Sequence, residues 1–182
     1  GNKYGVCRDK AALLVAMLQG AGFDAYPVLV NVGSKRDPEV PEPAFNHAIV
    51  GVELKKGEHI LMDPTAENTK ELLPSYECDQ SYLLCRPDGD TLRTSPIIPP
   101  EDNMMRIKTT ATLNASGNLE ARSELSFEGI NDNQYREAFA RMKPDDKQRF
   151  FERNLKRSMP GARLKSLKLI PEDMLDVSKN LQ

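Results

Sequence analysis

Histidine and cysteine are scarce in this sequence, and their scarcity limits the chemistry that it can hold. The 182 residues include only two histidines and three cysteines. The histidines are His47 and His59, and the cysteines are Cys7, Cys78 and Cys85. No CxxC pair is present, and an odd number of thiols does not make a closed disulfide framework. We therefore expect no metal site, and free thiols are the favoured interpretation of Cys78 and Cys85 over a disulfide.

Long apolar runs and an excess of one charge are also missing. The longest apolar run, AALLVAML at residues 11–18, is too short to cross a bilayer, and no secretion-signal pattern is visible. The net charge of −2 leaves no electrostatic footprint for nucleic acid or an anionic membrane. We expect no nucleic-acid partner and no membrane segment in these residues. Because the sequence begins six residues before Cys7, we also expect it to be a piece of a longer protein.

The order of the periodic segments predicts an α+β fold. Residues 8–19 are apolar on nearly every side, which is typical of a buried helix. Three segments then have the composition of strands, at 25–32, 46–54 and 59–63. One helix followed by a strand meander predicts a helix packed on an antiparallel sheet.

A proline-rich stretch, SPIIPPED at residues 95–102, predicts a linker between two regions. We place one domain at 1–98 and a β-rich C-terminal region at 99–182. The second region begins with an alternating run that turns at NASGN, the pattern of a β-hairpin. It continues with two helices between about residues 131 and 159 and a further strand at 162–170.

Three residues carry candidate chemistry, namely Cys7 at the start of the helix, His47 in the second strand and Asp63 at the end of the third. A helix N-terminus lowers the pKa of a thiol. Adjacent antiparallel strands can place His47 beside Asp63, so that Asp63 accepts the Nδ1 proton and Nε2 faces the sulfur. Taken singly, each residue has a structural interpretation, as a small packed side chain, a satisfied strand histidine and a turn residue. The set, in this order, predicts a cysteine nucleophile with its base and the group that orients the base.

The segments that hold these residues resemble the core of the transglutaminase-like superfamily. They are GVCRDKAALLVAMLQGAGFDAYPVLV, FNHAIVGVE and ILMDPTAEN, and the resemblance covers residues 4–75. The CRDKA and LMDPTAENTKELLP stretches look like the bacterial branch, whose members are large multidomain proteins. The resemblance implies a papain-like fold with a catalytic triad in which Cys7 is the nucleophile, His47 the general base and Asp63 the orienting group.

The same resemblance implies acyl transfer on amides through a thioester, without a metal or an organic cofactor. The substrate would be a protein, a peptide or a cell-wall amide, with hydrolysis by a protease or amidase favoured over transglutaminase crosslinking. It also implies that the full-length parent is an enzyme of the bacterial cell envelope or periplasm. The alternative is a non-catalytic cell-envelope interaction module that keeps the fold. The oligomeric state stays open.

Residues around the nucleophile give the remaining expectations. Tyr4 and Arg8 are candidates for the substrate cleft because they flank Cys7. Members of this superfamily use an oxyanion donor upstream of the nucleophile or the backbone N–H of the nucleophile itself. Because six residues precede Cys7, we expect an upstream donor to lie outside this sequence.

Overall fold

The structure, a computed structural model, describes residues 4–40, 42, 44–55 and 57–182. The chain divides into two compact units, Gly1–Pro100 and Glu101–Gln182. Helices and antiparallel strands are both present, which confirms the predicted α+β class. In the described part of the chain, no helix has the length and apolar character needed to cross a membrane.

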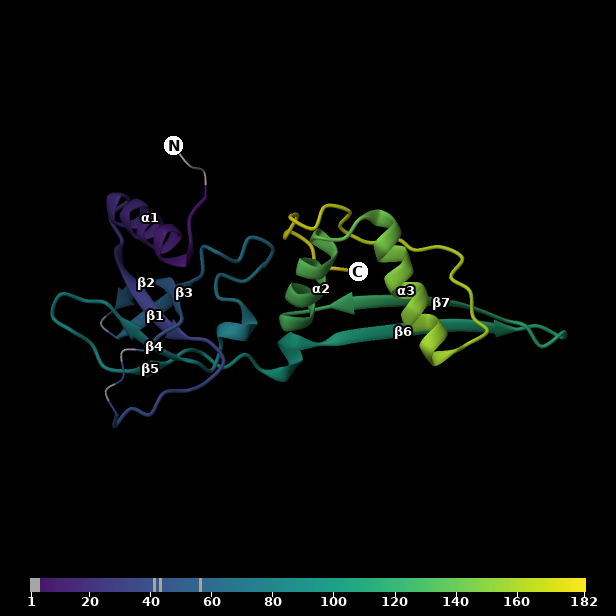
Figure 1. The fold of residues 1–182 in the computed structure, drawn as a ribbon, viewed down its shortest axis with the longest axis horizontal. Coiled ribbons are helices and arrows are strands. Elements are labelled where there is room, and N and C mark those ends of the chain that lie inside the picture. Colours follow the sequence, from purple (N-terminus) through teal and green to yellow (C-terminus); the bar gives the residue numbers. More distant parts are fainter. Residues whose placement is uncertain (1–3, 41, 43, 56) are drawn as a thin grey trace. The chain divides into compact units, whose positions relative to one another are not determined.

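The first unit is an antiparallel sheet with one long helix lying over it (Figure 1). Its strand order is β3-β2-β1-β4-β5. The elements are α1 (Cys7–Gly20), β1 (Asp24–Asn31), β2 (His47–Lys55), β3 (Glu58–Met62), the 3₁₀ turn η1 (Ser75–Glu77), β4 (Ser81–Leu84) and β5 (Arg93–Thr94). The predicted helix and the first three strands are confirmed. The sequence did not predict β4 and β5, of which β4 pairs with β1 on the side away from β2.

Helix α1 packs on the sheet through one side only. Ala11 and Val15 are buried there against the apolar side chains of β1 and β2. The prediction that the helix is buried all round is wrong, because Leu13 and Met17 are 62% and 63% exposed. A helix on a sheet directs only one stripe toward it, and among the described residues none covers the opposite side of α1.

The other face of the sheet is also apolar, and the turn η1 lies against it because the preceding residues pack there. Val28 and Ile49 are fully buried in the cluster on this face. Leu73 packs against that cluster, and η1 follows directly after the buried Pro74. This placement fixes Glu77, the last residue of η1, in the interior.

The second unit is a β-hairpin followed by two helices (Figure 1). Its elements are the 3₁₀ turn η2 (Pro100–Asn103), which begins at the unit boundary, then β6 (Met105–Leu113), β7 (Leu119–Phe127), α2 (Ile130–Ala140) and α3 (Pro144–Ser158). Phe127 and Phe139 form the buried core with Met174 and Leu181. The predicted strand at 162–170 is wrong, because these residues join no sheet. In the described chain, their backbone link to another segment is the pair between Ile170 and Gln182.

A buried ion pair holds the C-terminal segment onto α2. Arg136 is fully buried and donates from Nε and Nη2 to the Asp132 carboxylate at 2.8 and 3.1 Å. Its remaining donors reach the carbonyl oxygens of Met174, Asp176 and Lys179. The backbone N–H of Leu181 also donates to Asp132. All five guanidinium donors are therefore used, which offsets the cost of burying the charge.

We predict that Arg136→Met weakens the second unit by about 3–5 kcal/mol, because Asp132 would be left buried without its partner. The matched control is Arg141→Met at the end of the same helix, where an exposed pair with Glu137 is lost and the change stays within about 0.5 kcal/mol. Amide hydrogen exchange over residues 101–182 measures both. Equal protection in the two variants would contradict the role given to Arg136.

Candidate functional site

Cys7 is the first residue of α1, as the sequence predicts. The helix start is set by Asp9, whose carboxylate accepts the Val6 backbone N–H at 3.0 Å. The Cys7 side chain is half-buried at the edge of the apolar cluster under α1. The backbone N–H of Ala48, the His47 side chain and the backbone N–H of Arg8 are the neighbours that lower the pKa of its thiol. A thiol in this position receives positive potential from the helix and from a neighbouring imidazole.

His47 is the first residue of β2 and lies beyond the end of the ladder with β3. The last pair of that ladder is Val50 with Met62, so no β3 residue sits opposite His47. The residue before it, Asn46, bonds the Val32 backbone through both ends of its amide, each at 2.8 Å. These two bonds fix where β2 begins. The imidazole is thus held at a sheet end while its side chain stays 19% exposed.

Asp63 directly follows β3, and contacts with residues other than His47 hold it in place. Its backbone N–H donates to the Leu72 carbonyl at 2.8 Å, and its side chain is fully buried. Thr65 donates its backbone N–H to Asp63 Oδ1 at 2.8 Å, and the Thr65 hydroxyl lies 2.7 and 2.8 Å from the two carboxylate oxygens. The Asp63 side chain also contacts His47, whose Nε2 lies 3.2 Å from Asp63 Oδ2.

The ring of His47 is turned the opposite way from the sequence prediction. We predicted that Asp63 accepts the Nδ1 proton and leaves Nε2 for the sulfur, but Nε2 is the nitrogen beside Asp63. Nδ1 is then the nitrogen left for Cys7. Asp63 follows the end of β3, and Nε2 is the ring atom that lies 3.2 Å from both its carboxylate and that of Glu77 in η1. The strand order alone does not specify which ring edge faces which partner.

Glu77 is a further member of the site, and the sequence analysis missed it. The residue is 0% exposed, and its Oε1 lies 3.2 Å from His47 Nε2. Within the described chain, neither Glu77 carboxyl oxygen makes a hydrogen bond of acceptable geometry. Nothing in the SYE sequence of η1 marks a functional residue, since a glutamate in a short turn is normally solvated. Only the approach of η1 to the sheet reveals it.

The charges of this cluster are strongly coupled. Hydrogen bonding to Asp63, and then to Glu77, raises the pKa of His47 to about 10. Burial acts against ionisation of Asp63, but its bonds from His47, Glu77 and Thr65 outweigh that effect and lower its pKa to about 2. Burial raises the pKa of Glu77 to about 7, and the neighbouring charge of Asp63 acts in the same direction. Near neutral pH the cluster therefore holds an imidazolium, an aspartate and a glutamic acid that is close to its midpoint.

The surroundings of the three thiols also shift their pKa values, and not all in the same direction. Partial burial opposes ionisation of Cys7, yet hydrogen bonds from Ala48 and His47 outweigh it, and the pKa is lowered. Burial raises the pKa of Cys78 to about 11 and also raises that of Cys85, although Cys85 is exposed as a residue. All three cysteines are free. Cys7 is thus the thiol whose surroundings favour the thiolate.

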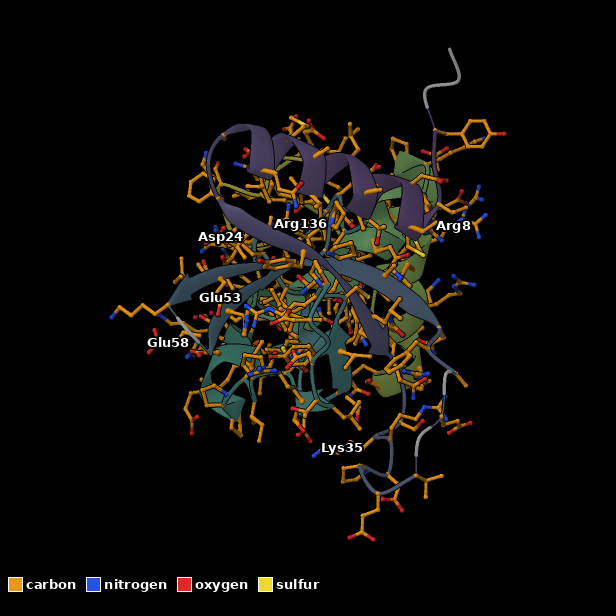
Figure 2. The ribbon with its side chains drawn as sticks, turned by 90° about the vertical axis from the view of Figure 1, so that its left-hand side faces the viewer. Arg8, Asp24, Lys35, Glu53, Glu58 and Arg136 are labelled. Atoms are coloured by element: carbon orange, nitrogen blue, oxygen red, sulfur yellow. The ribbon has the colours of Figure 1, made fainter. Side chains whose placement is uncertain are left out.

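The side chains of Tyr4 and Arg8, the two cleft candidates, are not among those of the hydrogen-bonded cluster, although the Arg8 backbone helps to lower the pKa of Cys7. Tyr4 is 83% exposed. Arg8 is exposed too, and Figure 2 shows its side chain pointing outward from the N-terminal end of α1. Both flank the half-buried Cys7 along the chain, so their contact with a substrate stays a prediction.

One set of residues in the described chain has the composition of a metal site. Ligand atoms of His47, Asp63 and Glu77 all lie within 4.8 Å of one another. The Thr65 hydroxyl already lies within hydrogen-bonding distance of both carboxylate oxygens of Asp63. A metal ion bound here would also have to bind His47 Nε2, the atom that now contacts Asp63. Metal ligation and the His47–Asp63 hydrogen bond are therefore mutually exclusive uses of these atoms.

Comparison with known proteins does not assign the chain to a family. No protein-family model, curated protein or solved structure matches it.

We predict that Glu77→Gln stabilises the protein relative to wild type more at pH 8 than at pH 5. A carboxyl whose folded pKa is about 7, above the ordinary 4.5, stabilises the fold below pH 4.5 and loses that contribution as the pH rises through 7. Glutamine does not ionise and escapes this loss, which amounts to at most about 3 kcal/mol. Urea unfolding of both proteins at the two pH values measures it. The same difference at both pH values would show that Glu77 ionises normally.

Proposed function

We propose that the protein catalyses cysteine-dependent acyl transfer on amides, with the transglutaminase-like, papain-like core that its sequence resembles. The observation that carries the proposal is the thiol of Cys7 at a helix N-terminus, with a pKa lowered by a neighbouring imidazole that is itself held by a buried aspartate. This is the arrangement that an activated cysteine nucleophile needs. Cys7 is the nucleophile, His47 the acid and base, and Asp63 the group that orients His47.

The first half of the reaction forms a thioester. The Cys7 thiolate attacks the amide carbonyl carbon, and the carbonyl electron pair moves onto oxygen. When the tetrahedral intermediate collapses, the carbon–nitrogen bond breaks and His47 gives its proton to the leaving amine. Asp63 keeps the ring in place during both steps through the 3.2 Å contact with Nε2.

The second half releases the acyl group. A water molecule attacks the thioester, His47 takes its proton, and the carbon–sulfur bond breaks to give a carboxylic acid and the thiolate. We favour water over a lysine amine as the acceptor, on the resemblance to bacterial members of the superfamily. The substrate class is then a protein, a peptide or a cell-wall amide.

A donor for the oxyanion is available from the helix itself. The first N–H groups of an α-helix have no intrahelical acceptor, and Cys7 and Arg8 occupy those positions in α1. The Cys7 backbone N–H therefore fits the role of an oxyanion donor beside its own sulfur. The helix dipole acts in the same direction.

We predict that iodoacetamide alkylates Cys7 at pH 7 roughly tenfold or more faster than Cys78 or Cys85, because only Cys7 has a lowered pKa. Cys85 is the matched control because it is the exposed thiol, so a rate set by accessibility alone would favour it. Asp63→Asn reduces the advantage of Cys7, since the imidazolium loses its charged partner. Mass mapping of adducts over time gives all three rates.

Two outcomes would count against the proposal. Equal rates at the three thiols in the folded protein would favour a non-catalytic interaction module with the same fold. A Cys7 rate that changes after treatment with a chelator would favour metal ligation by His47, Asp63 and Glu77 over their use in an acyl transferase.

A further inference from the structure

Glu77 has no structural role that would explain a carboxyl group at its position. Its side chain is 0% exposed, and the polar side chains that its carboxyl group faces are His47, whose Nε2 lies 3.2 Å from Oε1, and Asp63. Burying such a group costs free energy, and an apolar side chain of similar size would fill the space without that cost. Stability of the fold therefore does not account for Glu77.

The backbone around Glu77 is held firmly enough to aim its side chain. The Glu77 N–H donates to the Pro74 carbonyl at 2.9 Å, and the Glu77 carbonyl accepts the Ser95 hydroxyl at 2.6 Å. Ser95 is itself fixed by Gln80, with which it exchanges two hydrogen bonds. Unlike an exposed glutamate, Glu77 cannot swing away from His47.

The groups that face Glu77 are few. They are His47 at the start of β2, Asp63 after β3, and the thiol of the adjacent Cys78, on which Glu71 also acts. Asp63 is bonded by Thr65 and His47, interacts with Glu77 as well, and stays ionised. Two carboxyl groups in one buried site do not both ionise easily, so the proton that the pair retains belongs to Glu77.

We propose that Glu77 is a positioning residue that sets, by gaining or losing one proton, how strongly His47 holds its own. When Glu77 is neutral, His47 faces one negative charge, that of Asp63. When Glu77 is ionised, a second negative charge lies 3.2 Å from Nε2 and strengthens the imidazolium. A strongly held imidazolium stabilises the Cys7 thiolate but gives its proton less readily to a leaving amine. This inference rests on the proposed function, because it assigns Glu77 a role in the same site.

The test is the titration of the two histidines followed by ¹⁵N NMR. In wild type, the His47 signal should show a small step near pH 7, where Glu77 ionises beside it, and a large step near pH 10, where His47 loses its own proton. The pKa of His59 is lowered by burial, so its signal moves in a lower range, and a His59→Asn variant assigns it.

In Glu77→Gln, the step near pH 7 should vanish and the large step should move down by about 1–2 pH units. The matched control is Glu58→Gln, which changes an exposed glutamate at the opposite end of β3 from Asp63. In this control the His47 signal should titrate as it does in wild type. A folded Glu77→Gln protein that keeps both steps at the wild-type pH would overturn the proposal.

A second measurement keeps the proposal testable if Glu77→Gln does not fold. The carboxyl carbons of ¹³C-labelled glutamate in wild type should include one that titrates near pH 7, and its absence would overturn the proposal. The result is separable from that of the proposed function. Slow alkylation of Cys7 together with a His47 midpoint that shifts in Glu77→Gln would reject acyl transfer and keep the coupling of Glu77 to His47. Fast alkylation of Cys7 with an unshifted His47 midpoint would keep acyl transfer and reject the coupling.

Discussion

The hydrogen bond between His47 and Asp63 is the interaction on which the rest of the site depends. It forms because β2 extends past the last residue of β3, so no β3 residue lies opposite His47 and its Nε2 reaches a carboxylate that follows β3. Asp63 stays ionised because Thr65 and His47 supply its bonds. The resulting imidazolium favours the thiolate of Cys7. Without this bond, Cys7 would be only a half-buried thiol at a helix start, and Glu77 would be a buried acid with no imidazolium beside it.

Separate contacts in the first unit place the residues of this site. Packing of Ala11 and Val15 on the sheet holds α1, so the position of Cys7 is set by an apolar contact and not by the site itself. The amide of Asn46 sets the start of β2, and the Leu72 carbonyl sets Asp63. Each functional side chain is thus placed by a contact that substrate binding does not need to alter. A site built in this way is ordered before substrate arrives.

Much of this site could be predicted from the sequence because its signals are local. Cys7 directly precedes an apolar helical run, His47 begins a strand and Asp63 precedes a proline, so periodicity and turn chemistry place all three. The ring orientation of His47 could not be predicted, because the strand order does not specify which ring nitrogen faces Asp63. Glu77 could not be predicted, because it depends on η1 reaching the sheet, a non-local contact made through Leu73. For the same reason β4 was not predicted, since its four residues form a strand by pairing with β1, which is distant in the sequence, and with β5. The segment 162–170 has the composition of a strand, but the described chain offers no edge that it pairs with.

Trapping of an acyl-enzyme tests the central claim most directly. The protein is incubated with a p-nitrophenyl ester, and its intact mass is measured before and after hydroxylamine, which cleaves thioesters. We expect one acyl group on Cys7. It should be removed by hydroxylamine, form in the Cys78→Ser/Cys85→Ser double variant and be absent from Cys7→Ser. An adduct that persists in Cys7→Ser, or no adduct in a folded wild-type protein, would contradict the assignment of Cys7 as the nucleophile.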